Sequence, residues 1–193
     1  MKRRVRAFLT AERWAEAALE SIAGQGVARL AVKPLAEELG VTRGSFYWHF
    51  SSREALLRAA LDLWERRETA DIIARVERKA DPRERLEALF REVARDRRAG
   101  PLYLAIAAGC EERVVAKAVR RVADKRLGFL ARCYASLGLT PEQARFQAIL
   151  AYSAYLGLME LRRDATHALK QAEFEAYLEH LIDTLIPWAG KVR

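Results

Sequence analysis

The chain has 193 residues, a length that allows one large or two small domains. Because 51% of the residues are hydrophobic and 31% are charged, the composition excludes a disordered chain. Prolines and glycines are sparse, and the abundance of alanine, leucine, arginine and glutamate favours a wholly helical fold. The formal net charge of +8 favours a polyanionic partner, because phosphates that are neutralised by basic side chains release counterions.

The N-terminal segment and the cysteines indicate a cytoplasmic protein. The start MKRRVRAFL is basic, but its apolar run is too short for a secretory leader, and the uncharged run 146–159 is too short to span a bilayer. Cys110 and Cys133 are too few for a disulfide framework, so we interpret them as reduced thiols, with a redox pair as the alternative.

The chain starts with a basic arm, Lys2, Arg3, Arg4 and Arg6, which contains no acid. Such arms often bind nucleic acid.

The first predicted helix begins after Thr10, whose hydroxyl is suited to capping it. Trp14, Ala18 and Ile22 recur at helical spacing and are therefore expected to form its buried face. The sequence GQG at 24–26 is expected to end the helix.

Two short helices are predicted next, separated by a tight turn. The second helix begins near Lys33-Pro34, because proline is tolerated in a first turn, and it stops at Gly40. The third follows at once, with Thr42 as its cap, and the small Ala36 allows the two helices to cross closely. This pattern predicts a helix-turn-helix, although the spacing alone also fits an ordinary helical hairpin.

The third predicted helix carries the sequence RGSFYWHF. Its helical periodicity turns Phe46 and Phe50 inward and leaves Gly44 on the outside, where a glycine costs about 1 kcal/mol relative to alanine. An outward glycine beside an outward tryptophan indicates a surface that is covered in use and that a partner approaches closely. Hydrogen-bond donors and rings suited to phosphates and base edges surround this glycine: Arg43, Ser45, Tyr47, Trp48 and His49. The partner that these residues indicate is DNA.

The rest of the chain also reads as helices. Ser51 or Ser52 is expected to cap a long fourth helix that extends to about Lys79. Breaks are predicted at 81–82 and 100–101, and further helices are predicted over 82–93, 102–109, 111–137, 141–163 and 171–186.

Residues 26–57, GVARLAVKPLAEELGVTRGSFYWHFSSREALL, resemble the DNA-binding domain of TetR-family transcriptional regulators, and the spacing LGV…YWHF…REALL is specific. The resemblance implies a homodimer that usually represses transcription until its C-terminal domain binds a small ligand. It also implies that the bases of the DNA are contacted by Arg43, Gly44 and Ser45. The phosphates are expected to be held by Tyr47, Trp48, His49 and Arg53. Lys33 is expected to reach the DNA from the second helix, and Thr42 is a further candidate for DNA contact. One departure is Ala31, which stands where the family usually has a capping Ser or Thr with a phosphate contact.

These observations predict an all-α fold with an N-terminal three-helix DNA-binding domain, residues 1–52, joined by a long helix to an effector-binding and dimerisation domain, residues 53–193. We expect a ligand-responsive regulator, a repressor that binds a palindromic operator as a homodimer and is released by a small apolar or amphipathic effector. The alternatives are a ligand-independent DNA-binding protein and a helical-bundle enzyme. No cofactor or metal is expected, because the three histidines have no partner at metal-ligand spacing.

The C-terminal helices offer candidates for a dimer interface and for a ligand pocket. The small residues of QAILAYSAYLGLMEL (Ala148, Ala151, Ala154 and Gly157) and the apolar stripe of the last helix (Phe174, Leu178, Leu181 and Leu185) are suited to a four-helix interface across a two-fold axis. Helical spacing equally allows both stripes to complete the monomer core, and the family resemblance favours the dimer. The candidate pocket residues are Trp64, Phe90, Tyr103, Ile106, Phe129, Tyr134, Tyr152, Tyr155 and Met159.

Overall fold

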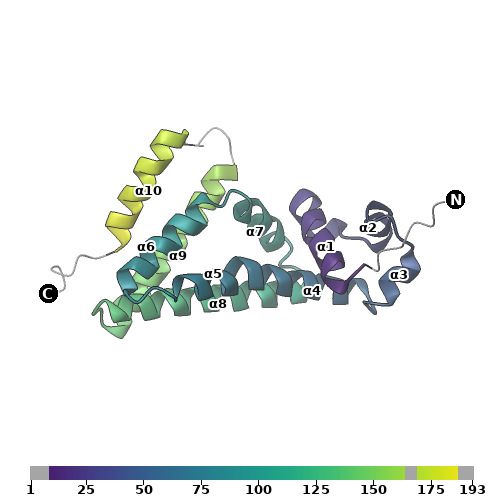
Figure 1. Ribbon diagram of the computed structural model, residues 1–193, viewed down its shortest axis with the longest axis horizontal. Coiled ribbons are helices and arrows are strands. Elements are labelled where there is room, and N and C mark those ends of the chain that lie inside the picture. Colours follow the sequence, from purple (N-terminus) through teal and green to yellow (C-terminus); the bar gives the residue numbers. More distant parts are fainter. Residues whose placement is uncertain (1–8, 164–168, 187–193) are drawn as a thin grey trace. The chain divides into compact units, whose positions relative to one another are not determined.

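The computed structural model describes residues 9–163 and 169–186, which form helices and turns without a strand (Figure 1). This confirms the predicted all-α fold. The chain divides into two compact units. The N-terminal unit comprises the residues up to Glu65 together with Ala105–Ala118, and the C-terminal unit comprises Arg66–Leu104 and the residues from Val119 onward. In the described part of the chain, no helix combines the length and the apolar composition needed to cross a membrane.

Helix α1 (Ala11–Gln25) forms as the sequence predicts. The Thr10 hydroxyl accepts a hydrogen bond from the Arg13 N–H at 3.2 Å, which satisfies a donor that the first turn leaves open. Trp14, Ala18 and Ile22 are fully buried on one face. Gly26 ends the helix, and its N–H donates to the Ile22 carbonyl.

The short turn η1 (Val27–Arg29) leads into a helix-turn-helix formed by α2 (Val32–Glu38) and α3 (Arg43–Tyr47), as Figure 1 shows. Gly40 lies between them at φ 66°, a left-handed conformation that favours glycine, and the Val41 N–H donates to the Ala36 carbonyl at 2.9 Å. Ala31 occupies the N-cap position of α2 and has no hydroxyl to offer there.

Helix α4 (Arg53–Glu65) belongs to the N-terminal unit, which corrects the domain boundary predicted at residue 52. Its first turn is capped by the Ser52 hydroxyl, which accepts from the Ala55 N–H at 3.1 Å. Leu57, Leu61 and Trp64 recur at helical spacing and are buried in this unit, where α4 packs on α1. Burial of this apolar stripe therefore extends the unit by one helix beyond the predicted three-helix domain.

A segment from the middle of the chain completes the N-terminal unit. It contains the end of α7 (Ala99–Ala107) and the start of α8 (Arg113–Ser136), with Ile106 and Val115 fully buried. Gly109 lies so close to the loop after α1 that an added Cβ would stand 2.8 Å from the Val27 Cβ. This contact requires glycine, because a larger side chain would displace Val27.

The C-terminal unit begins with η2 (Arg66–Ala70), a π-helical turn that continues directly into α5 (Asp71–Val76). The helical stretch predicted to about Lys79 therefore extends to Val76 and contains one π-helical turn. The next break also differs from the prediction: Gly100 and Pro101 lie inside the first turn of α7, and the break falls at 96–98. There the Asp96 carboxylate accepts hydrogen bonds from the N–H groups of Arg98 and Ala99 at 2.7 and 3.2 Å.

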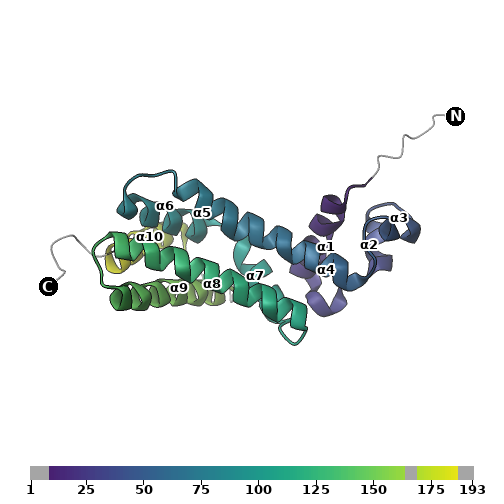
Figure 2. The same cartoon turned by 90° about the horizontal axis from the view of Figure 1, so that it is seen from below.

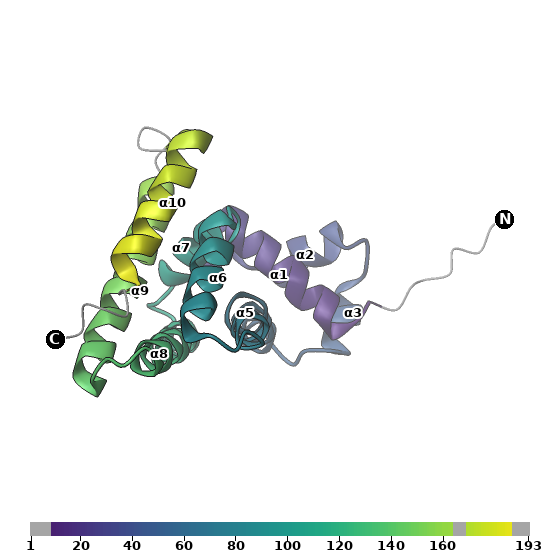
Figure 3. The same cartoon turned by 60° about the vertical axis from the view of Figure 1, so that its left-hand side comes forward.

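The core of the C-terminal unit is formed between α5, α6 (Pro82–Arg95), the later part of α8, α9 (Pro141–Arg163) and α10 (Gln171–Leu185) (Figure 2). The bounds of α9 are those that the sequence predicts. Figure 3 shows α10 lying along α9, and arginine–glutamate pairs tie α10 to α6: Arg91 bonds Glu179, and Arg95 bonds Glu175 at 2.9 Å.

Candidate DNA interface and effector cavity

Phe46 fixes helix α3 within the N-terminal unit. Its ring is fully buried and meets Trp14 edge-on at a centroid distance of 5.4 Å, and it lies 5.7 Å from the ring of Phe50. Edge-on aromatic pairs are favourable beyond their buried area. These contacts turn the other face of the helix and the following turn outward, with Trp48 89% exposed and Tyr47 58% exposed.

Gly44 lies exposed on this outward face. A Cβ added there would meet Thr42 Oγ1 at 3.6 Å, an ordinary van der Waals contact. Its φ lies outside the left-handed region, so the backbone does not require glycine either. Packing inside the chain therefore does not explain this glycine, whereas close approach of an outside partner does.

The other residues predicted to contact DNA lie mostly on the surface. Ser45 is half-buried, and the exposed ones are Lys33, Thr42, Arg43 and His49. Thr42 takes the extended N-cap conformation of α3, but its side chain makes no cap hydrogen bond, which corrects the predicted capping role. The basic arm Lys2, Arg3, Arg4 and Arg6 lies outside the described residues.

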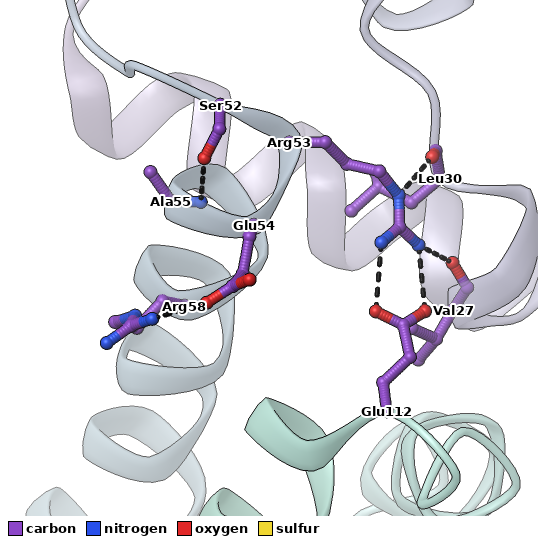
Figure 4. Close-up of polar contacts among 8 residues, drawn as sticks. All are labelled: Val27, Leu30, Ser52, Arg53, Glu54, Ala55, Arg58 and Glu112. Carbon is purple, nitrogen blue, oxygen red and sulfur yellow. Dashed lines mark hydrogen bonds and ion pairs between the residues drawn. The ribbon is translucent and has the colours of Figure 1, made fainter.

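Arg53 has a different role from the predicted phosphate contact (Figure 4). Its Nε donates to the Leu30 carbonyl at 2.8 Å, and its Nη2 donates to the Val27 carbonyl at 2.7 Å. Nη1 and Nη2 also form a paired contact with the Glu112 carboxylate at 2.9 and 3.0 Å. The hydrogen bonds that Arg53 donates to Glu112 raise the pKa of the guanidinium, and partial burial opposes this.

These bonds occupy four of the five N–H groups of an arginine and leave one for a phosphate. Arg53 also joins three segments of the N-terminal unit: the start of α4, the chain leading into α2, and the turn before α8. The sequence shows that Arg53 is a basic residue at a helix start. It does not show that Glu112, 59 positions away, pairs with it.

The C-terminal unit contains a cavity of about 50 Å³. Of the predicted pocket residues, Phe90, Phe129, Tyr152 and Tyr155 line it. The full lining is Glu68, Thr69, Ile72, Ile73, Leu89, Phe90, Val93, Arg126, Phe129, Leu130, Ala151, Tyr152 and Tyr155. The cavity is therefore mostly apolar, with a few polar groups contributed by η2 and α8.

The other five predicted residues do not line this cavity. Trp64 and Ile106 are buried in the N-terminal unit, and Tyr134 is buried with its hydroxyl donating to the Leu185 carbonyl at 3.0 Å. Met159 packs against Gly100, where its Cγ would lie 3.5 Å from an added Cβ, and Tyr103 is half-buried elsewhere on α7. Helical spacing identifies buried aromatics but does not separate a cavity wall from solid core.

Three polar lining residues were missed: Glu68, Thr69 and Arg126. Arg126 has a signal in the sequence, because it stands at helical spacing between Val122 and Leu130 on the apolar stripe of α8. A charged residue on such a stripe indicates a buried interaction. Burial, and then the charge of Asp96, raise the pKa of the Glu68 carboxyl, while Arg126 and two further arginines lower it.

Helix α9 exposes an apolar face that differs from the predicted dimer surface. Ala148 and Ala151 are buried in the core of their own unit, as are Phe174 and Leu178 of α10, so these four residues of the predicted stripes belong to the monomer core. The exposed apolar face, called here the α9 face, consists of Phe146, Ile149, Leu150 and Leu161. Gly157 is exposed on α9 as well, and an added Cβ there would meet nothing within 4 Å.

Both cysteines are free thiols. Burial raises the pKa of the Cys133 thiol to about 11, which suppresses the reactive thiolate, whereas Cys110 is exposed. Among the described residues, no cluster of three or more His, Cys, Asp or Glu side chains is arranged to hold a metal ion.

Residues 15–60 match the family model "Bacterial regulatory proteins, tetR family". This range covers α1 to α3 and the first part of α4, including the exposed face of α3 and the Arg53 cluster. The N-terminal helices are therefore those of a TetR-family DNA-binding region.

The curated relatives are similar to this chain over part of its length. The HTH-type transcriptional regulator TtgR of Pseudomonas putida is 40% identical over 90 residues, 43% of this chain and 42% of TtgR. The probable HTH-type transcriptional regulator ArpR of Pseudomonas putida matches to the same extent. The matched region thus spans about two fifths of these curated relatives.

Solved structures extend the likeness in fold to nearly the whole chain. A transcriptional regulator from Rhodococcus sp. Rha1 superposes with a TM-score of 0.76 at 22% identity, covering 92% of this chain and 96% of that one. A TetR transcriptional regulator from Legionella pneumophila gives 0.75 at 19% identity, covering 93% and 98%. The likeness in fold therefore extends to the C-terminal unit.

Proposed function

We propose that this protein is a ligand-responsive transcriptional regulator of the TetR family that binds a palindromic DNA operator as a homodimer and represses transcription. The observation that carries the proposal is the outward face of α3, the second helix of a helix-turn-helix. Its exposed glycine lies beside Arg43 and Tyr47, and the turn that follows the helix exposes Trp48 and His49. Such helices read base edges in the major groove while neighbouring side chains hold phosphates. A DNA operator is also the reason that we propose a cytoplasmic location.

The cavity in the C-terminal unit supports a ligand-responsive regulator over a ligand-independent DNA-binding protein. Its apolar wall with a few placed polar groups is typical of small-molecule sites. An effector releases DNA only if it binds the DNA-incompetent conformation more tightly, since equal affinity for both conformations shifts no population. An enzyme is disfavoured by the lining of the cavity, which holds one carboxylate and no histidine or cysteine.

Operator binding is tested by selecting duplexes from a random pool and footprinting the selected sequence. We expect protection of two symmetric half-sites whose centres lie about 34–36 Å apart or a multiple of one helical turn. Arg43→Ala is expected to reduce discrimination between the selected and scrambled duplexes, because one good base contact contributes about 1–3 kcal/mol. Selection that returns no enriched sequence, with equal affinity for all duplexes, would contradict the proposal.

The α9 face is the surface that we propose for the homodimer. Exposed apolar side chains gathered on one helix face are typical of interfaces, and Gly157 allows a second helix to approach closely. Leu150→Glu is expected to convert the dimer to monomer in analytical ultracentrifugation, because it buries an unpaired charge. Ala74→Glu adds the same charge at an exposed position of α5 and is expected to leave the dimer intact. A dimer that survives Leu150→Glu would place the interface elsewhere.

A further inference from the structure

Arg126 is a charged residue of the cavity lining whose guanidinium is held by contacts with η2 and with Tyr155. Its Nε donates to the Thr69 hydroxyl at 3.0 Å and its Nη2 donates to the Glu68 carbonyl at 2.9 Å, both in the π-helical turn η2. The guanidinium carbon lies 5.8 Å from the centre of the Tyr155 ring, within the range of a cation–π contact. Three contacts therefore hold the guanidinium in one orientation.

This orientation leaves one end of the guanidinium without a partner. Arg126 Nη1 is buried from solvent and makes no hydrogen bond within the described part of the chain. The Tyr152 hydroxyl is also buried and without a hydrogen bond within the described part of the chain, and the residue is only 8% exposed. Leaving a buried polar group without a hydrogen bond is costly, most of all for a charged group, so two such groups on one cavity wall are unusual.

Both unpartnered groups donate hydrogen bonds, and both belong to the lining of the same cavity. The Tyr155 hydroxyl, also on the lining, stays protonated at neutral pH, because burial raises its pKa to about 12. The chemical group that suits these donors is an oxygen acceptor, and an anionic oxygen suits the guanidinium best. Glu68 is the lining residue that opposes an anion.

We infer that the cavity binds the carboxylate of a small apolar acid, with Arg126 Nη1 and the Tyr152 hydroxyl as its donors and the aliphatic and aromatic wall around its carbon chain. This inference rests on the proposed function, since it names the chemical class of the effector. An apolar cavity of about 150 Å³ holds benzene. A volume of about 50 Å³ is smaller than that, so the lining side chains must move apart to admit an acid of four carbon atoms.

The test compares three ligands of the same length, sodium butyrate, butyramide and butylammonium chloride, by calorimetric titration of the full chain at constant ionic strength. We expect butyrate to bind at least about tenfold more tightly than the amide or the amine. Arg126→Gln and Tyr152→Phe are each expected to weaken butyrate binding by about tenfold, the effect of losing one strong hydrogen bond. Tyr152→Phe removes an oxygen that has no partner, so it should not destabilise the fold.

Two controls remove a matched group outside the cavity lining. Tyr134→Phe removes a hydroxyl that donates to the Leu185 carbonyl, and Arg132→Gln removes an exposed guanidinium from the same helix as Arg126. Both are expected to leave butyrate binding unchanged. Equal affinity for butyrate and butyramide would overturn the inference, as would butyrate binding that survives both cavity variants. Binding of the selected duplex by the same preparation tests the proposed function separately, so an intact duplex complex without butyrate binding refutes the inference alone.

Discussion

Replacing Gly44 with alanine is expected to stabilise the free protein by about 0.5–1 kcal/mol and to weaken binding to the selected operator by about 5- to 150-fold. The stabilisation follows because glycine costs conformational entropy in a helix, and the added Cβ meets an ordinary contact at 3.6 Å. The loss of affinity follows because a methyl group inserted into a tight interface costs about 1–3 kcal/mol. Urea denaturation and fluorescence titration with labelled duplex measure the two effects.

Gly24 provides the matched control for this prediction. It lies exposed near the end of α1, where an added Cβ would meet nothing within 4 Å. Gly24→Ala is therefore expected to change stability in the same direction as Gly44→Ala and to leave operator affinity unchanged. If Gly44→Ala binds the operator as tightly as the unmodified protein, the DNA backbone does not approach α3 at this point.

Replacing Arg53 with methionine is expected to lower the free energy of unfolding by about 2–3 kcal/mol. The change removes the donors to the Val27 and Leu30 carbonyls, and buried acceptors without a partner are costly. The lost ion pair contributes less, because both of its side chains are about one third exposed. Glu112→Gln keeps the two carbonyl bonds and is expected to lower stability by less than about 1 kcal/mol.

The same variant separates a structural arginine from one that binds phosphate. We expect Arg53→Met to weaken binding to every duplex, because α2 loses a fixed starting point, while the slope of log affinity against log salt stays unchanged. Lys33→Ala, which removes an exposed charge from α2, is expected to reduce that slope by about 0.9, the value for one phosphate contact. A reduced slope for Arg53→Met would restore the phosphate role that its sequence position suggests.

The features that are encoded locally were predictable from the sequence. Thr10, Gly26 and Ser52 mark helix ends through their own hydroxyls or backbone conformation, and the inward positions of Phe46 and Phe50 follow from periodicity alone. The exposed face of α3 was predictable for the same reason, since a helix that buries two rings on one side presents its other residues outward.

The features that were missed depend on contacts between distant parts of the chain. Glu112 pairs with Arg53 across 59 positions, and Arg126 bonds the turn that holds Thr69 across 57 positions. Small-residue spacing on α9 predicted close packing but not on which side of the helix it would occur. Ala148 and Ala151 are buried in the monomer core, whereas Phe146 and Leu150 are exposed on the opposite side of the helix.

The N-terminal unit is formed from two separate stretches of the chain, so it cannot be transferred to another protein as one continuous segment. A recombination that joins residues 1–65 to another effector domain would carry Arg53 and Val27 but leave Glu112 and Gly109 behind. The recipient would then have to supply a carboxylate and a glycine at the matching turn, or the transplanted domain would lose both contacts. Chimaeric regulators made from this chain should therefore carry Ala105–Ala118 together with the N-terminal helices, as a two-piece graft.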